Sequence, residues 1–368
     1  MIPSIWVGKR VFLTGHTGFK GSWLTLMLRR LGAQVAGYAL SPPTEPNLFS
    51  VARVGEDVIS QISDIRDGNA LRTAIGDFSP DVVFHLAAQP LVRASYALPV
   101  ETYETNVMGT IHLLEAVRQT PSVKATVIVT SDKCYDNRET IWAYRENDAM
   151  GGYDPYSSSK GCAELVTASY GRSYFQPSMG KSSIVSVRAG NVIGGGDWAD
   201  DRLMADLARA LLANRAITIR SPEAVRPWQH VLEPLSGYLM AAEKILTDGP
   251  APWTAWNFGP DTESEQTVGA LAQCTCRAWG RPDALEVAQD PNAVHEAGLL
   301  KLDSTKARTY LGWRPRWNFE EAVTHAVAWY RAYPDGADMR AYTLAQIEAY
   351  EIAGKNTERG LNMRGYRT

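Results

Sequence analysis

The sequence has few of the features that mark disulfide-rich, membrane or nucleic-acid-binding proteins. Its four cysteines, in 368 residues, are too few and too irregularly spaced for a disulfide framework or a zinc site. No apolar run approaches the roughly 18 residues needed to span a bilayer, and the N-terminus lacks the order of a secretory signal. The 37 basic and 40 acidic side chains give a formal net charge of −3, with no basic block. We therefore expect a cytoplasmic protein that has no membrane, nucleic-acid or metal partner.

Short runs rich in valine and isoleucine recur in the first half of the chain and alternate with longer amphipathic stretches. These runs begin at Arg10, Gln34, Val58, Asp81, Ala125 and Ser183. Nearly continuous apolar strands that alternate with helices are typical of a parallel sheet covered on both faces. The predicted fold class is α/β, with a Rossmann-type doubly wound parallel sheet and a smaller mixed α/β C-terminal substrate domain.

The composition and the apolar pattern of the sequence change after about residue 190, where prolines and tryptophans are frequent and the apolar residues are irregularly spaced. We expect a dinucleotide-binding domain over residues 1–190 and a substrate domain over residues 191–350. A helix and a strand within 228–260 could return to the first sheet, so that the two domains interleave. Residues 351–368 are polar, which predicts a mobile tail.

Three glycines spaced three residues apart, Gly15, Gly18 and Gly21, follow the first predicted strand and open an amphipathic helix. Glycine lets the backbone turn sharply and approach a pyrophosphate, while the first amides of the helix face its charge. In this context the triplet predicts a dinucleotide site. The end of the second strand, GYALSPPT, carries neither the acid expected for the ribose of NAD nor an arginine for the 2′-phosphate of NADP. NAD is the favoured cofactor.

Asp64 ends the third predicted strand and fits two interpretations. Its carboxylate could accept a hydrogen bond from the adenine amino group of the dinucleotide, or it could cap the helix that follows.

Two pairs of polar residues are candidates for proton transfer. Tyr156 and Lys160 lie four apart on a predicted helix and can share a face. A nearby ammonium group favours the phenolate and lowers the pKa of tyrosine from about 10 toward neutrality, so Tyr156 is a candidate general base. Asp132 and Lys133 stand together where an apolar strand stops. Taken alone, such a pair is usually an exposed ion pair.

The motifs TGHTGFKG, HLAAQ, TSDK, YSSSK and NVIGGGDW occur in this order, followed by RPWQHV and LDSTKARTYLGWRP. Together they resemble the extended short-chain dehydrogenase/reductase family over nearly the whole chain. The resemblance implies that Ser131, Tyr156 and Lys160 form a hydride-transfer set. An acid–base pair directly after the serine is typical of its nucleotide-sugar 4,6-dehydratases, and the Asp132-Lys133 pair resembles those that act on CDP-D-glucose.

That resemblance implies an enzyme that removes water from a nucleotide hexose by internal hydride transfer through NAD. Asp132 would protonate the leaving C6 hydroxyl. Lys133 would either take the C5 proton or stay charged and stabilise the enolate, and both roles remain open. The competing functions are a dehydratase for another nucleotide sugar, a 4-epimerase, or a protein that binds NAD or a nucleotide sugar without turnover.

The resemblance also implies the residues that contact each ligand. The cofactor contacts are Gly15, Gly18, Phe19, Gly21, Asp64, Ile65, Leu86, Ala87, Ala88, Tyr156 and Lys160. The substrate contacts are Gln89, Asn191, Arg202, Arg226 and His230. Arg226 is the strongest candidate for a phosphate ligand, because a guanidinium can grip phosphate with two hydrogen bonds. Family members are commonly dimers through a helix pair that includes the Tyr156 segment, so a homodimer or a dimer of dimers is expected.

Four further polar or aromatic residues have mainly structural interpretations. His16, His85 and Trp228 are expected to be structural, although Trp228 could pack beside the nucleotide base. Asn106 either supports the active-site helix by hydrogen bonding or is an ordinary buried asparagine.

Overall fold

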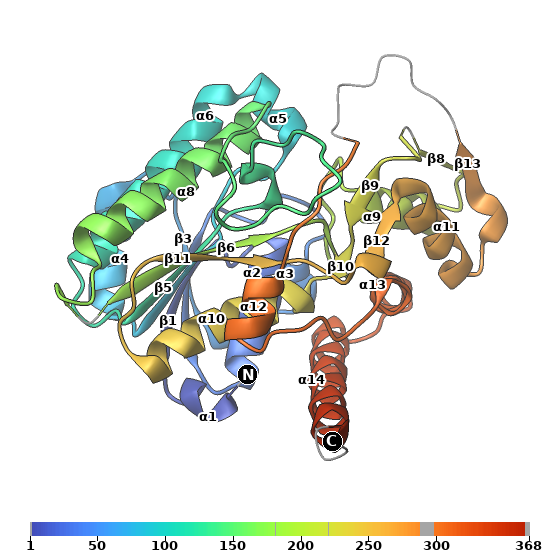
Figure 1. Ribbon diagram of the computed structural model, residues 1–368. Helices are drawn as coiled ribbons and strands as arrows, with labels where there is room; N and C mark the ends of the chain where they lie inside the picture. The colour runs from blue at the N-terminus through green and yellow to red at the C-terminus, as the bar shows by residue number, and fades with distance from the viewer. Residues whose placement is uncertain (1, 181, 220, 288–297, 365–368) are drawn as a thin grey trace.

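The computed structural model describes residues 2–180, 182–219, 221–287 and 298–364. Its main body is a sheet of seven parallel strands in the order β11-β6-β5-β4-β1-β2-β3 (Figure 1). The strands are β1 (Arg10–Thr14), β2 (Gln34–Ala39), β3 (Ile59–Ile62), β4 (Val82–His85), β5 (Ala125–Val129), β6 (Ser183–Ala189) and β11 (Thr254–Phe258). Each of the six predicted apolar runs contains one of these strands.

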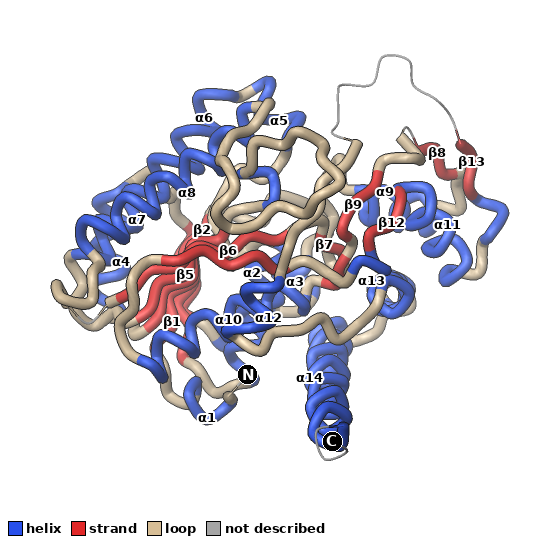
Figure 2. The backbone as a smooth tube through the Cα atoms, viewed as in Figure 1, coloured by secondary structure: helices blue, strands red, loops and turns tan. Residues whose placement is uncertain are grey.

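Helices cover both faces of this sheet, which confirms the doubly wound fold (Figure 2). Because side chains alternate along a strand, Phe12 and Val11 of β1 join different cores. Phe12 packs toward α4 (Gly68–Phe78), α7 (Gly109–Arg118) and α8 (Pro155–Tyr174). Val11 packs toward α2 (Phe19–Arg30) and α10 (Leu232–Asp248).

One strand departs from the expectation of a fully covered sheet. All four residues of β3 are exposed. This strand is the last in the sheet order and has a strand neighbour on one side only, so its side chains pack less than those of the central strands.

The C-terminal half adds three small two-stranded sheets beside the carboxyl ends of the main strands (Figure 1). They are formed by β7 (Val192–Ile193) with β10 (Gln229–His230), β9 (Val225–Pro227) with β12 (Glu265–Thr267), and β8 (Ile217–Ile219) with β13 (Leu285–Val287). The helices beside these small sheets are α9 (Leu203–Leu212), α11 (Val268–Trp279) and α13 (Phe319–Ala332), whereas α12 (Thr305–Tyr310) packs against β11 of the main sheet. Within residues 228–260, α10 covers the main sheet and β11 pairs with β6. The domain boundaries near residue 190 stay a prediction.

Short helical segments complete the described chain. They are α1 (Pro3–Trp6), α3 (Leu48–Val51), α5 (Val92–Ala97), α6 (Pro99–Tyr103), the 3-10 turns η1 (Val54–Asp57), η3 (Asp132–Cys134), η4 (Thr262–Ser264) and η5 (Pro282–Ala284), and the π-helical turn η2 (Glu104–Met108).

The mobile tail expected for the polar residues 351–368 stays a prediction, and part of this segment is helical. Helix α14 runs over Met339–Arg364, and residues 365–368 lie outside the described part of the chain. The segment is polar, but its alanine, glutamate, lysine and arginine residues are strong helix formers.

The described residues form neither a membrane-spanning helix nor a cluster of metal ligands. No helix among them is long and apolar enough to cross a membrane. No group of three or more histidine, cysteine, aspartate or glutamate side chains among them is arranged to hold a metal ion.

Candidate active site

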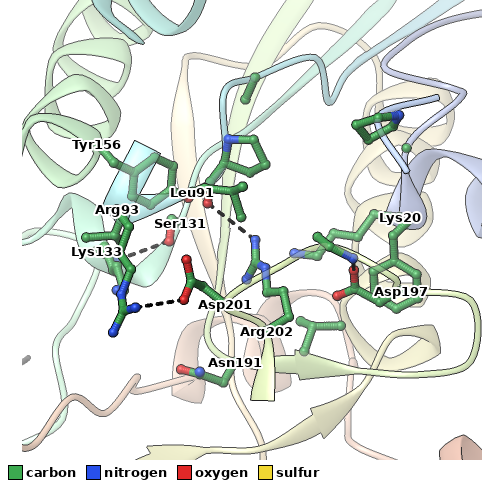
Figure 3. Close-up of a pocket in the computed structure, with 18 of the residues that line it drawn as sticks. Lys20, Leu91, Arg93, Ser131, Lys133, Tyr156, Asn191, Asp197, Asp201 and Arg202 are labelled. Carbon is green, nitrogen blue, oxygen red and sulfur yellow. Dashed lines mark hydrogen bonds and ion pairs between the residues drawn. The ribbon is translucent and has the colours of Figure 1, made fainter. Parts of the chain in front are cut away.

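A cleft of about 1160 Å³ opens at the carboxyl ends of the main strands, where the sheet meets the C-terminal half (Figure 3). Its walls come from the segments that follow β1 through β6 and from α9 and β8. Ligands of open parallel sheets bind at this edge. The volume exceeds the roughly 300–1,000 Å³ of pockets for one drug-sized ligand, so the cleft has room for two nucleotides.

The glycine turn after β1 leaves space that a side chain would fill. Gly15 has φ +79°, and a Cβ there would lie 2.7 Å from the backbone nitrogen of Ala87. A Cβ on Gly21 would lie 2.0 Å from the Gly15 carbonyl oxygen. Gly18 is the N-cap of α2, and Phe19 is its first residue. This turn and the first amides of α2 line the cleft and fit the pyrophosphate of a dinucleotide.

Asp64 is held by a neighbouring arginine. Its carboxylate accepts hydrogen bonds from the Arg66 backbone N–H at 2.8 Å and from the Arg66 guanidinium at 2.6 Å, and these bonds lower its pKa. The interpretation of Asp64 as a helix cap is wrong, because Asp67 accepts from the first amides of α4. Asp64 lines the cleft with Ile65, and its contact to adenine stays a prediction.

The remaining predicted cofactor residues follow β4. Leu86, Ala87 and Ala88 lie on the cleft wall beside the glycine turn. The parallel pairing of β1 with β4 brings these two segments to one edge of the sheet.

The strand-end pair Asp132-Lys133 lies in the cleft and is not an exposed ion pair. Ser131 follows β5 and caps η3, accepting from the Lys133 backbone N–H at 3.2 Å. The Ser131 hydroxyl donates to Asp132 Oδ1 at 2.9 Å. Asp132 is only 3% exposed, and its Oδ2 has no hydrogen-bond partner among the described atoms. Burial raises the pKa of this carboxyl, which favours its protonated form.

Tyr156, labelled in Figure 3, and Lys160 both line the cleft from the first two turns of α8. This helix begins at Pro155, and the Asp154 side chain caps it by accepting from the Ser157 N–H at 2.9 Å. Burial lowers the pKa of Lys160 to about 8, and its Nζ donates to the Val129 carbonyl at 3.4 Å.

The expected lowering of the Tyr156 pKa is not found. Burial of the phenol raises its pKa, while a hydrogen bond with Ser131 and the charge of Arg202 act in the opposite direction. The reason is that the side chain is only 8% exposed, so the phenolate loses much of its hydration.

Three of the predicted substrate residues reach the cleft. Asn191, Arg202 and Arg226 line it from the C-terminal half. Arg226 is largely buried and donates to the Val225 carbonyl at 2.9 Å, and Arg202 donates to the Pro90 carbonyl at 3.3 Å. The charge of Arg226 acts to lower the pKa of Asp132, and the charge of Arg202 acts to lower the pKa of Tyr156.

The structure does not place the other two predicted substrate residues, Gln89 and His230, in the cleft. The Gln89 side chain is occupied by its own loop, since it donates to the Leu91 carbonyl and accepts from the Leu91 N–H at 2.6 Å. His230 is fully buried between Trp23 and Trp317, with its ring centre 4.8 Å from that of Trp317. Neither Gln89 nor His230 lines the cleft, so the geometry does not support the prediction that they bind substrate.

The structural interpretations of His16, His85 and Asn106 are confirmed, whereas Trp228 is buried and also lines the cleft, so its packing beside the nucleotide base stays a prediction. The buried ring of His16 bonds to Ser60 at 2.7 Å, and His85 bonds to Thr14 at 2.8 Å inside the protein. Trp228 is 4% exposed and donates to the Gln266 carbonyl. Asn106 donates to the Ser159 hydroxyl at 2.8 Å and so supports α8, as one of its two interpretations predicted.

Lys20 is a cleft residue that the sequence motifs did not reveal. It stands in the first turn of α2, and Figure 3 shows its side chain in the cleft near Asp197. Burial and the charge of Arg202 lower its pKa to about 8. The sequence does contain a signal for Lys20, because it is a charged residue between Gly18 and Gly21 of the turn, where the glycine motif requires no particular residue.

Comparison with known proteins places this geometry in a family. The family model described as GDP-mannose 4,6 dehydratase matches residues 12–326. The chain is 53% identical to a CDP-glucose 4,6-dehydratase of Salmonella typhimurium, over 95% of this chain and 98% of that protein. The solved UDP-glucose 4-epimerase of Thermus thermophilus, a complex with NAD, superposes with a TM-score of 0.76 at 26% identity, covering 88% of this chain and 99% of that one. The chain therefore belongs to the GDP-mannose 4,6 dehydratase family, among the extended short-chain dehydrogenase/reductases that its motifs resemble.

Proposed function

We propose that the protein is an NAD-dependent CDP-D-glucose 4,6-dehydratase, a hydro-lyase that forms CDP-4-keto-6-deoxy-D-glucose and water for deoxysugar biosynthesis. One observation carries this proposal: Ser131, Asp132, Lys133, Tyr156 and Lys160 line a single cleft beside the glycine turn. The 53% identity to the Salmonella CDP-glucose 4,6-dehydratase supports the choice of nucleotide. In this assignment residues 1–190 with 228–260 hold NAD, and residues 191–350 contribute the substrate side.

The first half of the reaction is an oxidation at C4 of the hexose. NAD, when bound in the glycine turn, supplies the hydride acceptor for C4 and later returns the hydride to C6. Tyr156 removes the proton of the C4 hydroxyl, which Ser131 holds by a hydrogen bond. Lys160, with a pKa of about 8, is mostly charged at neutral pH, so it can hold the nicotinamide ribose, while Ser131 and Arg202 oppose the rise in the pKa of Tyr156.

The second half is the elimination of water across C5 and C6. Asp132 donates a proton to the departing C6 hydroxyl, because burial raises its pKa and leaves Oδ2 free to meet that oxygen. The C5 proton is acidified by the C4 ketone and leaves with assistance from Lys133, either as a base or as a charge that stabilises the enolate. The C6 hydroxyl and the proton from Asp132 leave together as water. The resulting 4-keto-5,6-ene then gains the hydride at C6 and a proton at C5, which gives the 4-keto-6-deoxy product.

The nucleotide diphosphate is bound from the C-terminal half. Arg202 and Arg226 carry positive charge on that wall, and Asn191 lines the cleft with them. A guanidinium matches two phosphate oxygens at once, so Arg226 is the main phosphate ligand.

Two other functions use the same cleft in different ways. A 4-epimerase needs the oxidation set but no acid for a leaving hydroxyl, whereas Asp132 is buried with a free oxygen beside that set. A protein that only binds nucleotides has no use for a buried acid and a buried amine in one cleft. These features favour the dehydratase.

The test is product analysis. The protein is incubated with NAD and, in separate reactions, CDP-, dTDP-, UDP- and GDP-hexoses, and each mixture is analysed by mass. A product lighter by one water from CDP-glucose supports the proposal. A product of unchanged mass that chromatography separates from the substrate would identify an epimerase, and binding without any product would identify a binding protein.

We also propose a homodimer that pairs α7 and α8 of two copies. Exposed apolar side chains lie on α8 and just before α7, where Leu165 and Met108 are 61% and 43% exposed. Covering such a face would stabilise a dimer. Leu165→Glu should halve the mass measured by light scattering, and a parent protein that is already monomeric would contradict this.

A further inference from the structure

A buried ion pair behind the cleft joins the two segments that carry the proposed catalytic side chains. Glu164 on α8 and Arg188 on β6 are 2% and 1% exposed. The guanidinium donates two parallel hydrogen bonds to the carboxylate, from Nε to Oε1 at 2.9 Å and from Nη2 to Oε2 at 2.7 Å. Bonds of this bidentate kind fix orientation as well as distance.

The carboxylate of Glu164 accepts two further hydrogen bonds. The Thr130 hydroxyl donates to Oε1 at 2.5 Å, and the Ser186 hydroxyl donates to Oε2 at 2.7 Å. Burial by itself would raise the pKa of Glu164, but the bonds from Arg188, Thr130 and Ser186 keep it below its ordinary value. The carboxylate is therefore charged and held from several directions.

Contacts of the ion pair bracket the strand-end segment Ser131–Lys133. Thr130, which bonds to Glu164, directly precedes this segment. On its other side, Arg188 Nη1 donates to the Tyr135 hydroxyl at 2.6 Å, and that hydroxyl donates to Asn257 Oδ1 at 2.8 Å. The segment is thus anchored at both ends to one pair of charges.

The same pair is also fixed to the helix that carries Tyr156. Glu164 lies one helical turn after Lys160 and two turns after Tyr156, and residues four apart share a helix face. We propose that Glu164 and Arg188 form a positioning pair, which sets the strand-end segment against Tyr156 so that elimination follows oxidation in one bound geometry. This inference rests on the proposed function, because only a reaction of two steps needs the strand-end segment and Tyr156 to be aligned on one bound substrate.

The most selective test removes one hydroxyl and leaves the ion pair in place. In Tyr135→Phe, Arg188 no longer holds the far end of the strand-end segment, but its two bonds to Glu164 remain. A displacement of about 1 Å in a catalytic group can lower a rate by about 100-fold. We expect kcat to fall by about 10- to 100-fold with KM within about twofold of the parent. Bound NADH should accumulate, because oxidation at Tyr156 continues while elimination slows.

Two further variants separate positioning from stability. Thr167→Val is the matched control, since it removes a buried hydroxyl of α8 that donates to the Ala163 carbonyl of the same helix; it should keep the parental kcat and NADH level. Arg188→Lys keeps the charge but cannot donate to both Glu164 and Tyr135 in the same way. It should therefore accumulate NADH as Tyr135→Phe does.

Hydrogen exchange of the unliganded protein gives a readout that does not require turnover. Backbone amides of residues 131–134 should exchange faster in Tyr135→Phe, while those of α8 should exchange as in the parent. Parental exchange together with a parental NADH level in Tyr135→Phe would overturn the inference, as would slower turnover without NADH accumulation. If the parent itself forms no keto sugar from any nucleotide hexose, the proposed function fails, and the exchange result still decides the positioning role.

Discussion

Burial acts on the acids and the amines of the cleft in opposite directions. It raises the pKa of Asp132 and Tyr156, and it lowers the pKa of Lys20 and Lys160 to about 8. In each case burial favours the neutral form of the side chain more than water does. The shifts of Asp132, Lys20 and Lys160 are toward neutral pH, where a group can give and take protons, whereas the shift of Tyr156 is away from neutral pH.

Tyr156 tests the oxidation step. The phenol is proposed to move a proton and not to hold the ligand, so Tyr156→Phe should lose more than about 100-fold of kcat while nucleotide-sugar affinity changes little. Turnover and equilibrium binding of CDP-glucose are measured on the same preparation. Near-normal turnover would remove Tyr156 from the mechanism.

Lys133 tests the elimination step. Lys133→Met should still oxidise C4, because Ser131, Tyr156 and Lys160 remain, and so it should accumulate NADH and a 4-keto-glucose species. If Lys133 is the base, substrate in deuterated water should show no exchange at C5, whereas an enolate-stabilising Lys133 predicts slower exchange. A variant as active as its parent would mean that Lys133 has no catalytic role, since exposed ion pairs contribute only about 0–1 kcal/mol to stability.

Lys20 tests the energetic effect of a buried charge. Its pKa is lowered from 10.5 to about 8, so the charged amine destabilises the fold below pH 8 by up to about 3 kcal/mol. Above pH 8 the folded protein loses the proton before the unfolded chain does, and stability rises with pH. Lys20→Met should therefore be more stable than the parent at about pH 7, with an advantage that shrinks toward about pH 10.

Urea unfolding at the two pH values measures this advantage, with Lys244→Met as the control. Lys244 is exposed and pairs with Asp248 at 2.7 Å, so its removal should change the free energy of unfolding by less than about 0.5 kcal/mol. An advantage of Lys20→Met that is equal at both pH values would mean that packing of the methionine, and not loss of the charge, is responsible.

At the scale of elements, the turn between β1 and α2 depends on the absence of a side chain. A methyl group on Gly21 would lie 2.0 Å from the Gly15 carbonyl oxygen, so Gly21→Ala should distort the cradle and abolish measurable NAD binding. Gly76 in α4 is a matched control, because a Cβ there meets no atom within 4 Å. Gly76→Ala should keep NAD affinity and stabilise the protein by about 0.4–1 kcal/mol. Equal NAD affinity in the two variants, measured by calorimetry, would contradict the role of the turn.

The elements that could be predicted from the sequence are those specified by residues close together in the chain. The glycine turn and the ends of β4 and β5 are each specified by neighbouring residues, so the cofactor side and the strand-end segment could be placed from sequence. His230 could not, because Trp317 and His325, far later in the chain, surround its ring. Arg188 was missed for the same reason, since nothing local to β6 shows that it meets Glu164 of α8.

At the scale of the molecule, the cleft is built by both halves of the chain. Arg93 of α5 forms an ion pair with Asp201 of the C-terminal half at 3.0 Å, and both residues line the cleft (Figure 3). The return of α10 and β11 to the main sheet ties the same halves together behind it. Ligands that fill the cleft therefore contact both halves and should stabilise the whole fold.

We expect the protein to bind NAD weakly. The segment after β2 carries no acid before Glu45, and the nearest carboxylate at the end of β3, Asp64, is already bonded to Arg66. The adenosine ribose thus lacks a charge-assisted hydrogen bond of roughly 1.5–3 kcal/mol, which lowers affinity by about tenfold or more. The purified protein should lose NAD on dialysis, need added NAD for full activity, and show a melting temperature that rises with NAD concentration. Full activity after thorough dialysis, with one NAD retained per chain, would show that other contacts replace the missing acid.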